Sequence, residues 1–429
     1  MSNGTAHGEA VGRAERAVGF PPDVIHRAAP RFATVLTPKR LRVYATLMAA
    51  TMWTFLIVDM SARGTTDRLG KVKGTDFLEF YVLGTIAHEG RWEQLFDVRA
   101  FYARTHAVAP DSTETLYLTV QGPQVALLFS PLAVHPYTVA LAVWLAVVFA
   151  MYACSCYLLW KDCTALHPHR AIVGAWCVAF PGLYSEVLHG QLAGVALAAV
   201  TLALYALRRG WKFVAGLALG ALVFKPHWAL AAGAVFLFAR EWRVVAGAAV
   251  TAVAQVTVTY LAVGASVMSA YWRALQSVPR IAYLLEPQPG DSLRGLISVF
   301  APSESAALVA YGAGAFVTLL IASRVWRSSA PVEIRLSAIV LALILITPHV
   351  NSYDLILLAP VVFFLADWLV RSPDGRHRVA LSTWLSIVMV APILDGLPAI
   401  VRLQFSVTAM AAILFLLWRV AHVEAQASG

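Results

Sequence analysis

The stretch LRVYATLMAATMWTFLIVDMS, residues 41–61, is the first segment of this chain that is long and apolar enough to cross a membrane. A membrane-spanning helix needs about 20 mostly apolar residues. Lys39, Arg40 and Arg42 stand at its start, and an excess of Lys and Arg marks cytoplasmic loops, so we place the N-terminus inside. Of the 429 residues, 59% are hydrophobic and only 13% are charged. Because soluble domains carry roughly 25% charged residues, an all-α polytopic membrane protein is predicted.

The formal net charge of +9 does not indicate a nucleic-acid partner. The basic residues gather in short polar segments between apolar runs, which is what the positive-inside rule expects of cytoplasmic loops. The four cysteines, Cys154, Cys156, Cys163 and Cys177, lie in or beside apolar runs and show neither CxxC nor zinc spacing. They therefore predict neither a disulfide nor a metal site.

Counting the apolar runs, with the basic loops inside, predicts about 12 crossings. The segment QGPQVALLFSPLAVHP, residues 121–136, is interpreted as a helix on the outer surface, because counting it as a span would leave an odd total. The expected organisation is a disordered cytosolic tail at 1–40, one transmembrane domain at 41–420 with two large extracytoplasmic loops at 62–135 and 265–303, and a cytosolic tail at 421–429. The first loop is expected to be long and helical.

Several of the predicted crossings are well below a full span. They are Ala171–Phe180, Phe213–Phe224, Ala229–Ala239 and Leu336–Ile346, and polar residues follow at their outer ends. Irregular backbone at membrane depth is tolerated where it lines a water-filled cavity. We therefore expect such a cavity to open on the outer face.

Two carboxylates stand one helical turn apart in GTDFLEFYVLGTIAHEG, residues 74–90, shortly after the first span. In one interpretation either Thr75 or Asp76 caps the helix that follows, and Asp76 and Glu79 have the spacing of a capping box. The other is catalysis, because a carboxylate within hydrogen-bond reach of a hydroxyl is a suitable general base. The two roles are compatible, since a capping bond leaves lone pairs free.

Other polar residues fall on the same outer side. Lys225 precedes Pro226 at a break between two apolar runs, where a lysine either snorkels or binds an anion such as phosphate. Arg294 and Arg402 compete for the role of phosphate ligand. His349 is either a hydrogen-bonded structural histidine or a catalytic one. Three further acids are interpreted as loop or capping residues: Glu186, Asp291 and Asp354.

The sequence contains no Walker A pattern, GxSxG elbow, HExxH motif or Rossmann glycine fingerprint. No predicted cytosolic segment is long enough to bind ATP or a nucleotide sugar. Energy for any group transfer must then arrive in the membrane, as an activated lipid.

The outer segments resemble those of glycosyltransferase family 87, whose members have the GT-C fold. The similarity follows a fixed order of short motifs along most of residues 41–370. The matching residues are Asp76–Tyr81, Leu95–Asp97, Pro123–Leu132, Gly190 with Gln191, Ala215–Gly220, Lys225 with Pro226, and Pro348 with His349.

This resemblance implies an inverting transfer of a hexose such as mannose from a polyprenyl-phosphate sugar to a lipid or glycan acceptor. The reaction would take place on the extracytoplasmic side of the inner (plasma) membrane, without nucleotide, cofactor or metal. Carried over by residue, Asp76 is the general base, His349 lies near the donor sugar or phosphate, and Lys225 and Arg294 hold the phosphate. The other predicted substrate-binding residues are Glu79, His189, Gln191, His227 and Tyr353.

The main alternative is a transporter or flippase of a lipid-linked sugar or another anion. It explains short helices and buried cations equally well, but it does not need an acidic outer loop. A membrane polymerase or ligase acting on lipid-linked glycans is a second alternative. An Asp76→Asn variant distinguishes the classes, because a transporter would still move its substrate.

Overall fold

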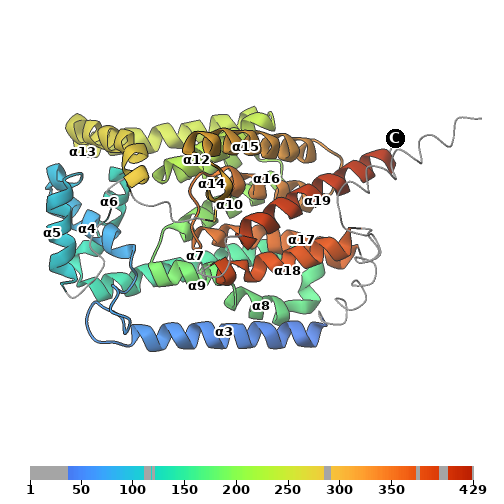
Figure 1. Cartoon of the computed structure of the whole chain (residues 1–429), viewed down its shortest axis with the longest axis horizontal. Coiled ribbons are helices and arrows are strands. Elements are labelled where there is room, and N and C mark those ends of the chain that lie inside the picture. The colour runs from blue at the N-terminus through green and yellow to red at the C-terminus, as the bar shows by residue number, and fades with distance from the viewer. Residues whose placement is uncertain are drawn as a thin grey trace, which may run out of the picture.

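The computed structural model describes residues 37–110, 117, 121–284, 291–372, 377–395 and 404–427. Every regular element within these ranges is a helix, and most of the long helices run along the long axis of the molecule (Figure 1). The prediction of an all-α polytopic membrane protein is therefore confirmed.

The helices follow one another with few residues between them. In chain order they are α3 (Pro38–Met60), α4 (Phe77–His88), η1 (Trp92–Gln94), α5 (Val98–Val108), α6 (Pro123–Phe129), η2 (Leu132–Val134), α7 (Tyr137–Asp162), η3 (Thr164–His169), α8 (Arg170–Val178), α9 (Pro181–His189), α10 (Ala193–Arg208), α11 (Lys212–Gly220), η4 (Ala221–Phe224), α12 (Pro226–Phe238), α13 (Trp242–Leu284), α14 (Leu293–Phe300), α15 (Glu304–Trp326), α16 (Val332–Ile346), η5 (Asp354–Leu358), α17 (Ala359–Arg371), α18 (Arg378–Asp395) and α19 (Phe405–Ala427).

Six helical stretches in the described ranges are long and apolar enough to cross a membrane. They are α3, α7, Thr164–His189, Trp242–Ser277 of α13, α15, and Phe405–His422 of α19. The predicted total of about 12 crossings requires the shorter helices α10, α11, α12, α16, α17 and α18 to cross as well, and it stays a prediction.

One of the predicted short crossings is wrong. Ala171–Phe180 does not end at Phe180, because α9 follows α8 after a two-residue break and the helical stretch reaches His189. Pro181 stands in the first turn of α9, where its missing N–H breaks no helical hydrogen bond. Pro181 is thus the residue at which the helix begins again.

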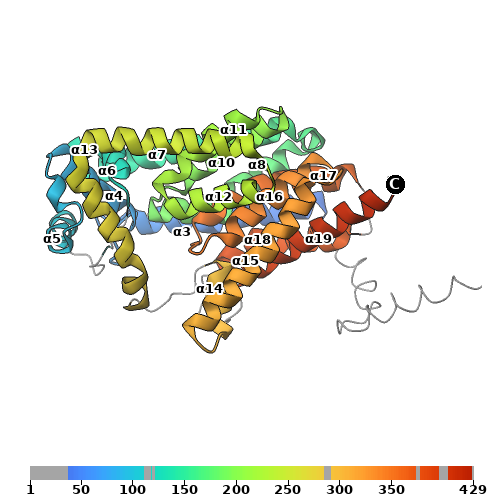
Figure 2. The ribbon, with the colours of Figure 1, turned by 90° about the horizontal axis from the view of Figure 1, so that it is seen from above.

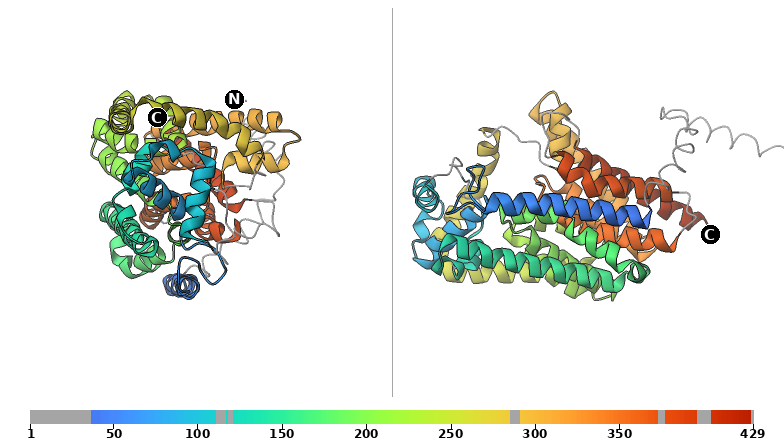
Figure 3. Two further views of the ribbon diagram at one scale, coloured as in Figure 1. Left: turned by 90° about the vertical axis from the view of Figure 1, so that its left-hand side faces the viewer. Right: turned by 90° about the horizontal axis from the view of Figure 1, so that it is seen from below.

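The helices α4, α5 and α6 gather at one end of the molecule, opposite the C-terminal end of α19 (Figure 1). Figure 3, left, looks onto this end. The first loop is helical, as expected. Since α6 has only 7 residues and η2 only 3, neither is long enough to cross a bilayer, which supports the surface interpretation of residues 121–136.

An aromatic core fixes the first loop on α7. The ring centroid of Phe77 lies 5.5 Å from that of Tyr137, and the Phe129 ring lies 4.7 Å from the Trp144 ring. The Tyr137 hydroxyl donates to the Lys73 carbonyl oxygen at 2.6 Å. These contacts hold the start of α4 against the start of α7.

Small residues allow α11 to lie directly on α13 (Figure 2). A Cβ atom on Gly216 would collide with the Val244 carbonyl oxygen, and one on Gly247 would collide with the Phe213 carbonyl oxygen. The backbones therefore meet without intervening side chains, which is the packing that small residues permit between membrane helices.

The long helix α13 breaks at Gly264, whose backbone angles are φ 83° and ψ 171°. This conformation is readily available only to glycine. Beyond the break α13 turns away from its first half (Figure 2). The predicted second loop, 265–303, thus begins as a helix that continues to Leu284, and residues 285–290 lie outside the described ranges.

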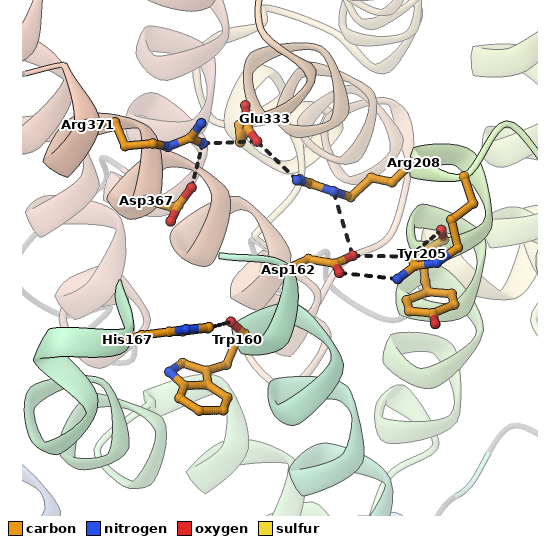
Figure 4. Close-up of polar contacts among 9 residues, drawn as sticks. Trp160, Asp162, His167, Tyr205, Arg208, Glu333, Asp367 and Arg371 are labelled. Atoms are coloured by element: carbon orange, nitrogen blue, oxygen red, sulfur yellow. Dashed lines mark hydrogen bonds and ion pairs between the residues drawn. The ribbon is translucent and has the colours of Figure 1, made fainter. Parts of the chain in front are cut away.

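Charged side chains join the ends of four helices that lie away from the first loop. Figure 4 draws their contacts. Glu333 accepts from Arg208 at 3.2 Å and from Arg371 at 3.0 Å. Arg209 reaches Asp162 at 3.3 Å. Asp367 pairs with Arg371 and also accepts the backbone N–H of Ala165 at 2.8 Å. Three arginines thus face three carboxylates across the ends of α7, α10, α16 and α17.

We predict that Glu333→Gln destabilises the protein by about 3 kcal/mol, because two arginines lose a buried counter-charge. The Glu333 side chain is only 5% exposed. Thermal unfolding of the purified protein in detergent measures the loss. The matched control is Glu89→Gln, which removes a 2.6 Å pair with Arg104 from a side chain that is 40% exposed. That control should cost below about 1 kcal/mol, and equal losses would contradict the prediction.

Candidate active site

The turn between α9 and α10 holds Asp76 at the start of α4. The Gln191 Nε2 atom donates to Asp76 Oδ2 at 2.6 Å. The Asp76 backbone N–H donates to the His189 carbonyl oxygen at 3.0 Å. Asp76 and Gln191 are 115 positions apart in the sequence, so their contact arises from packing of the first loop on the bundle.

The capping interpretation of Asp76 is wrong. Asp76 occupies the N-cap position of α4, but its side chain makes no capping hydrogen bond, and its φ of −80° and ψ of −21° are helical. A capping side chain normally belongs to an extended residue. The reciprocal bond of a capping box is also missing, because the Asp76 N–H is bonded to His189. The carboxylate is therefore available for chemistry.

Glu79 lies one turn along α4 and is 7% exposed. Its Oε1 atom has no hydrogen-bond partner among the described residues. Burial and, next, the Asp76 carboxylate raise the pKa of Glu79 to about 8, against the opposing effects of Gln121 and Lys225. Glu79 is thus mostly protonated at neutral pH.

Lys225 is buried and forms an ion pair with Asp354 at 3.2 Å. Its ammonium group also lies 5.1 Å from the centre of the Tyr353 ring. Pro226 disfavours a helical backbone at the residue before it, so Lys225 is extended and η4 ends there. The loop-or-cap interpretation of Asp354 missed this pair, although Asp354 Oδ2 does also accept the Asn351 N–H at 3.1 Å.

The segment between α16 and η5 carries His349. Its Nε2 atom lies 3.3 Å from Asn351 Nδ2, and the same amide donates to the Tyr353 hydroxyl. Although solvent reaches the imidazole, the surrounding protein displaces enough water to lower the pKa of His349. Asp354 opposes this shift, while Lys225 and Arg294 add to it. His349 is therefore mostly neutral at neutral pH.

His189 connects the residues around Asp76 with those around Lys225 and His349. Its ring meets the Tyr353 ring edge-on at 5.4 Å, and its Nδ1 atom lies 2.8 Å from the Ser185 carbonyl oxygen. The hydroxyls of Ser185 and Ser352 are 2.7 Å apart. These contacts join the end of α9 to the segment that carries His349, so the Asp76 side and the Lys225 side form one cluster.

Arg294 lies at the start of α14, which approaches the same segment. Ser292 caps α14 through Gly295 N–H at 3.0 Å, and its hydroxyl donates to the Pro348 carbonyl oxygen at 3.1 Å. Within the described ranges Arg294 forms no ion pair, unlike Lys225. Arg402 lies outside the described residues.

His227 is less closely connected. It stands in the first turn of α12, half-buried, and no hydrogen bond joins it to another predicted site residue in the described part of the chain. Glu186, interpreted as a loop or capping residue, is fully buried in α9, and its Oε1 accepts the Gly194 N–H at the start of α10 at 2.9 Å. No three His, Cys, Asp or Glu residues in the described ranges could hold a metal ion.

Residues 120–348 match the sequence model of glycosyltransferase family 87. The match spans more than half of the chain, and the chain belongs to this family. It is therefore a membrane glycosyltransferase, and the predicted resemblance is confirmed. Gln191, Lys225 and Arg294 fall inside the matched residues, whereas Asp76 precedes them and His349 follows them. Searches of curated proteins and of solved structures gave no significant match.

The raised pKa of Glu79 predicts how the stability of the folded protein depends on pH. This pKa rises from 4.5, the ordinary value, to about 8 on folding, so this carboxyl stabilises the fold fully below pH 4.5 and loses that effect as pH rises towards 8. Glu79→Gln keeps the neutral shape at every pH. Its melting temperature should be close to that of wild type near pH ~5 and exceed it by roughly a few degrees near pH ~9.

The measurement is thermal unfolding in detergent at both pH values. Glu93→Gln is the control, because Glu93 is exposed and no pH-dependent gain is expected there. A gain for Glu79→Gln that is the same at both pH values would show that the folded protein does not keep Glu79 protonated.

Proposed function

We propose that the protein is an inverting glycosyltransferase that moves a hexose such as mannose from a polyprenyl-phosphate sugar to a lipid or glycan acceptor. The observation that carries this proposal is the Asp76 carboxylate, which is not a helix cap and is fixed by Gln191 in one cluster with His349 and Lys225. Family membership supports the reaction class. The helical first loop supports a GT-C arrangement.

The proposed reaction is a single displacement. Gln191 donates a hydrogen bond to Oδ2 of Asp76, while Oδ1 makes no hydrogen bond among the described residues. Oδ1 would take the proton from the acceptor hydroxyl as that oxygen attacks the anomeric carbon. The bond from that carbon to the phosphate oxygen breaks, and the lipid phosphate leaves with the electron pair. Attack opposite the leaving group inverts the configuration.

Arg294 is the better candidate for the donor phosphate. Lys225 already has a buried counter-ion in Asp354, whereas Arg294 has none in the described part of the chain and influences the charge of His349. A guanidinium fork is well suited to phosphate oxygens. Neutral His349 would lie beside that phosphate, and Lys225 would hold Asp354 and Tyr353 in place.

The proposed orientation puts this site on the extracytoplasmic side of the inner (plasma) membrane. The opposite helix ends carry basic residues, among them Arg208, Arg209 and Arg371 of the ion-pair network, and Lys212, which pairs with Glu241 at 2.8 Å. An excess of such residues marks the cytoplasmic side. The predicted outer cavity stays part of this proposal.

We predict that Asp76→Asn lowers the rate of sugar transfer by about 10²–10⁴-fold, the usual contribution of a general base. Purified protein in lipid vesicles would be given radiolabelled polyprenyl-phosphate mannose, glucose, arabinose or galactose with extracted native lipids. The labelled glycolipid identifies the donor. Asp97→Asn is the matched control, because Asp97 caps α5 in the same loop and asparagine can make the same capping bonds.

Full transfer by Asp76→Asn would refute its role as base. If neither wild type nor Asp76→Asn transfers sugar, but both translocate a sugar lipid, the result would instead support the transporter alternative.

Arg294→Gln should raise the KM for the donor by about tenfold or more, the usual effect of losing a charged hydrogen bond. Arg273→Gln is its control, because Arg273 is an exposed arginine of the same predicted loop. Initial rates over a range of donor concentrations give the comparison. An unchanged KM for Arg294→Gln would mean that another cation, such as Lys225, binds the phosphate.

A further inference from the structure

Gln191 is buried, with 4% of its surface exposed, and both ends of its amide are occupied. The Nε2 atom donates to Asp76 Oδ2 at 2.6 Å, and the Oε1 atom accepts the Leu192 N–H at 3.1 Å. The flipped orientation of this amide is unfavourable. It would place the amide oxygen against the carboxylate, which are both acceptors, and the NH₂ group against the Leu192 N–H, which are both donors. A side chain in this state has little capacity left to bind a sugar or phosphate.

The backbone around Gln191 is fixed against the same region. Gly190 has a left-handed conformation, with φ 65° and ψ 35°, and a Cβ atom there would lie 2.7 Å from the Cβ atom of Phe77. The Trp144 indole donates to the carbonyl oxygens of Gly190 at 3.0 Å and Gln191 at 3.3 Å. With the Asp76 N–H bonded to His189, the turn and the start of α4 are held as a unit.

We propose that Gln191 is a positioning residue for Asp76 rather than a substrate ligand. Its amide immobilises one carboxylate oxygen and leaves Oδ1 as the oxygen that accepts the proton of the acceptor hydroxyl. This inference rests on the proposed role of Asp76 as general base. Misplacement of a catalytic group by about 1 Å lowers rates by about 10²-fold, so the effect belongs in kcat.

The test is a double-mutant cycle of Gln191→Met and Asp76→Asn. Sugar transfer is measured in lipid vesicles with the donor that the assay of Asp76→Asn identifies. Methionine keeps the length of the side chain and removes the donor. We expect Gln191→Met to lower kcat by about 10–100-fold with the donor KM within about twofold of wild type. In the Asp76→Asn background the same substitution should cause no further loss, because Gln191 acts only through Asp76.

Gln124→Met is the matched control. Gln124 is a half-buried glutamine of α6 whose amide donates to the Val223 carbonyl oxygen at 3.4 Å, and no hydrogen bond joins it to Asp76 in the described part of the chain, so kcat should be unchanged. Trp144→Phe provides a second arm if Gln191→Met does not fold. It removes the indole N–H together with part of the buried ring system, and it should lower kcat at constant donor KM, again with no added loss beside Asp76→Asn.

The outcomes separate this inference from the proposed function. Full activity of Asp76→Asn overturns both. Loss in Asp76→Asn with wild-type kcat in Gln191→Met overturns the positioning role alone. A large rise in donor KM at constant kcat would make Gln191 a substrate ligand, and an equal further loss in the double variant would show that Gln191 acts independently of Asp76. Either result overturns the inference.

Discussion

Backbone N–H and C=O groups have no water to bond in the hydrocarbon of a bilayer, so a helix can break there only where protein or a water-filled cavity supplies the missing partners. The cluster around Asp76 lies at breaks between helices whose backbone groups are bonded by other parts of the protein. At the α9–α10 turn, Trp144 bonds the carbonyl oxygens of residues 190 and 191. After α16, the Ser292 hydroxyl bonds the Pro348 carbonyl oxygen. The partners that satisfy each break come from other helices, so satisfying the backbone also brings the polar side chains together.

Ion pairs join α7, α10, α16 and α17 at the ends that lie away from the cluster. The termini of α7, α10, α16 and α17 that face away from the cluster carry the network of Asp162, Arg208, Glu333 and Arg371. Helix α10 has 16 residues and so spans about 24 Å between the two ends. Helices α10 and α16 are thus held at both ends, by ion pairs at one and by hydrogen bonds to the adjoining backbone breaks at the other. Such a frame limits how far the cluster can move.

Hydropathy and charge predicted the helical membrane fold, and the family motifs predicted the class of enzyme, because both signals are local in the sequence. The contacts of the cluster were not predictable in this way. Gln191 meets Asp76 across 115 positions and Lys225 meets Asp354 across 129, and nothing local specifies either pair. The capping interpretation failed for a related reason, since the spacing of Asp76 and Glu79 was right but the Asp76 N–H is taken by a distant carbonyl. The predicted short crossing Ala171–Phe180 was wrong because a second helix begins at Pro181, after a two-residue break that follows α8.

The protonation of Glu79 has a consequence for substrate entry. A buried carboxyl with a pKa of about 8 adds little negative charge beside Asp76 at neutral pH, which would reduce the repulsion on the phosphate of the proposed donor. That neutrality depends on the exclusion of water by the packed aromatic side chains around α4. Looser packing in the first loop would hydrate Glu79, ionise it and repel the donor without any change in a residue that touches the substrate. In the proposed reaction, the aromatic core of this loop would therefore keep Glu79 neutral as well as support the structure of the loop.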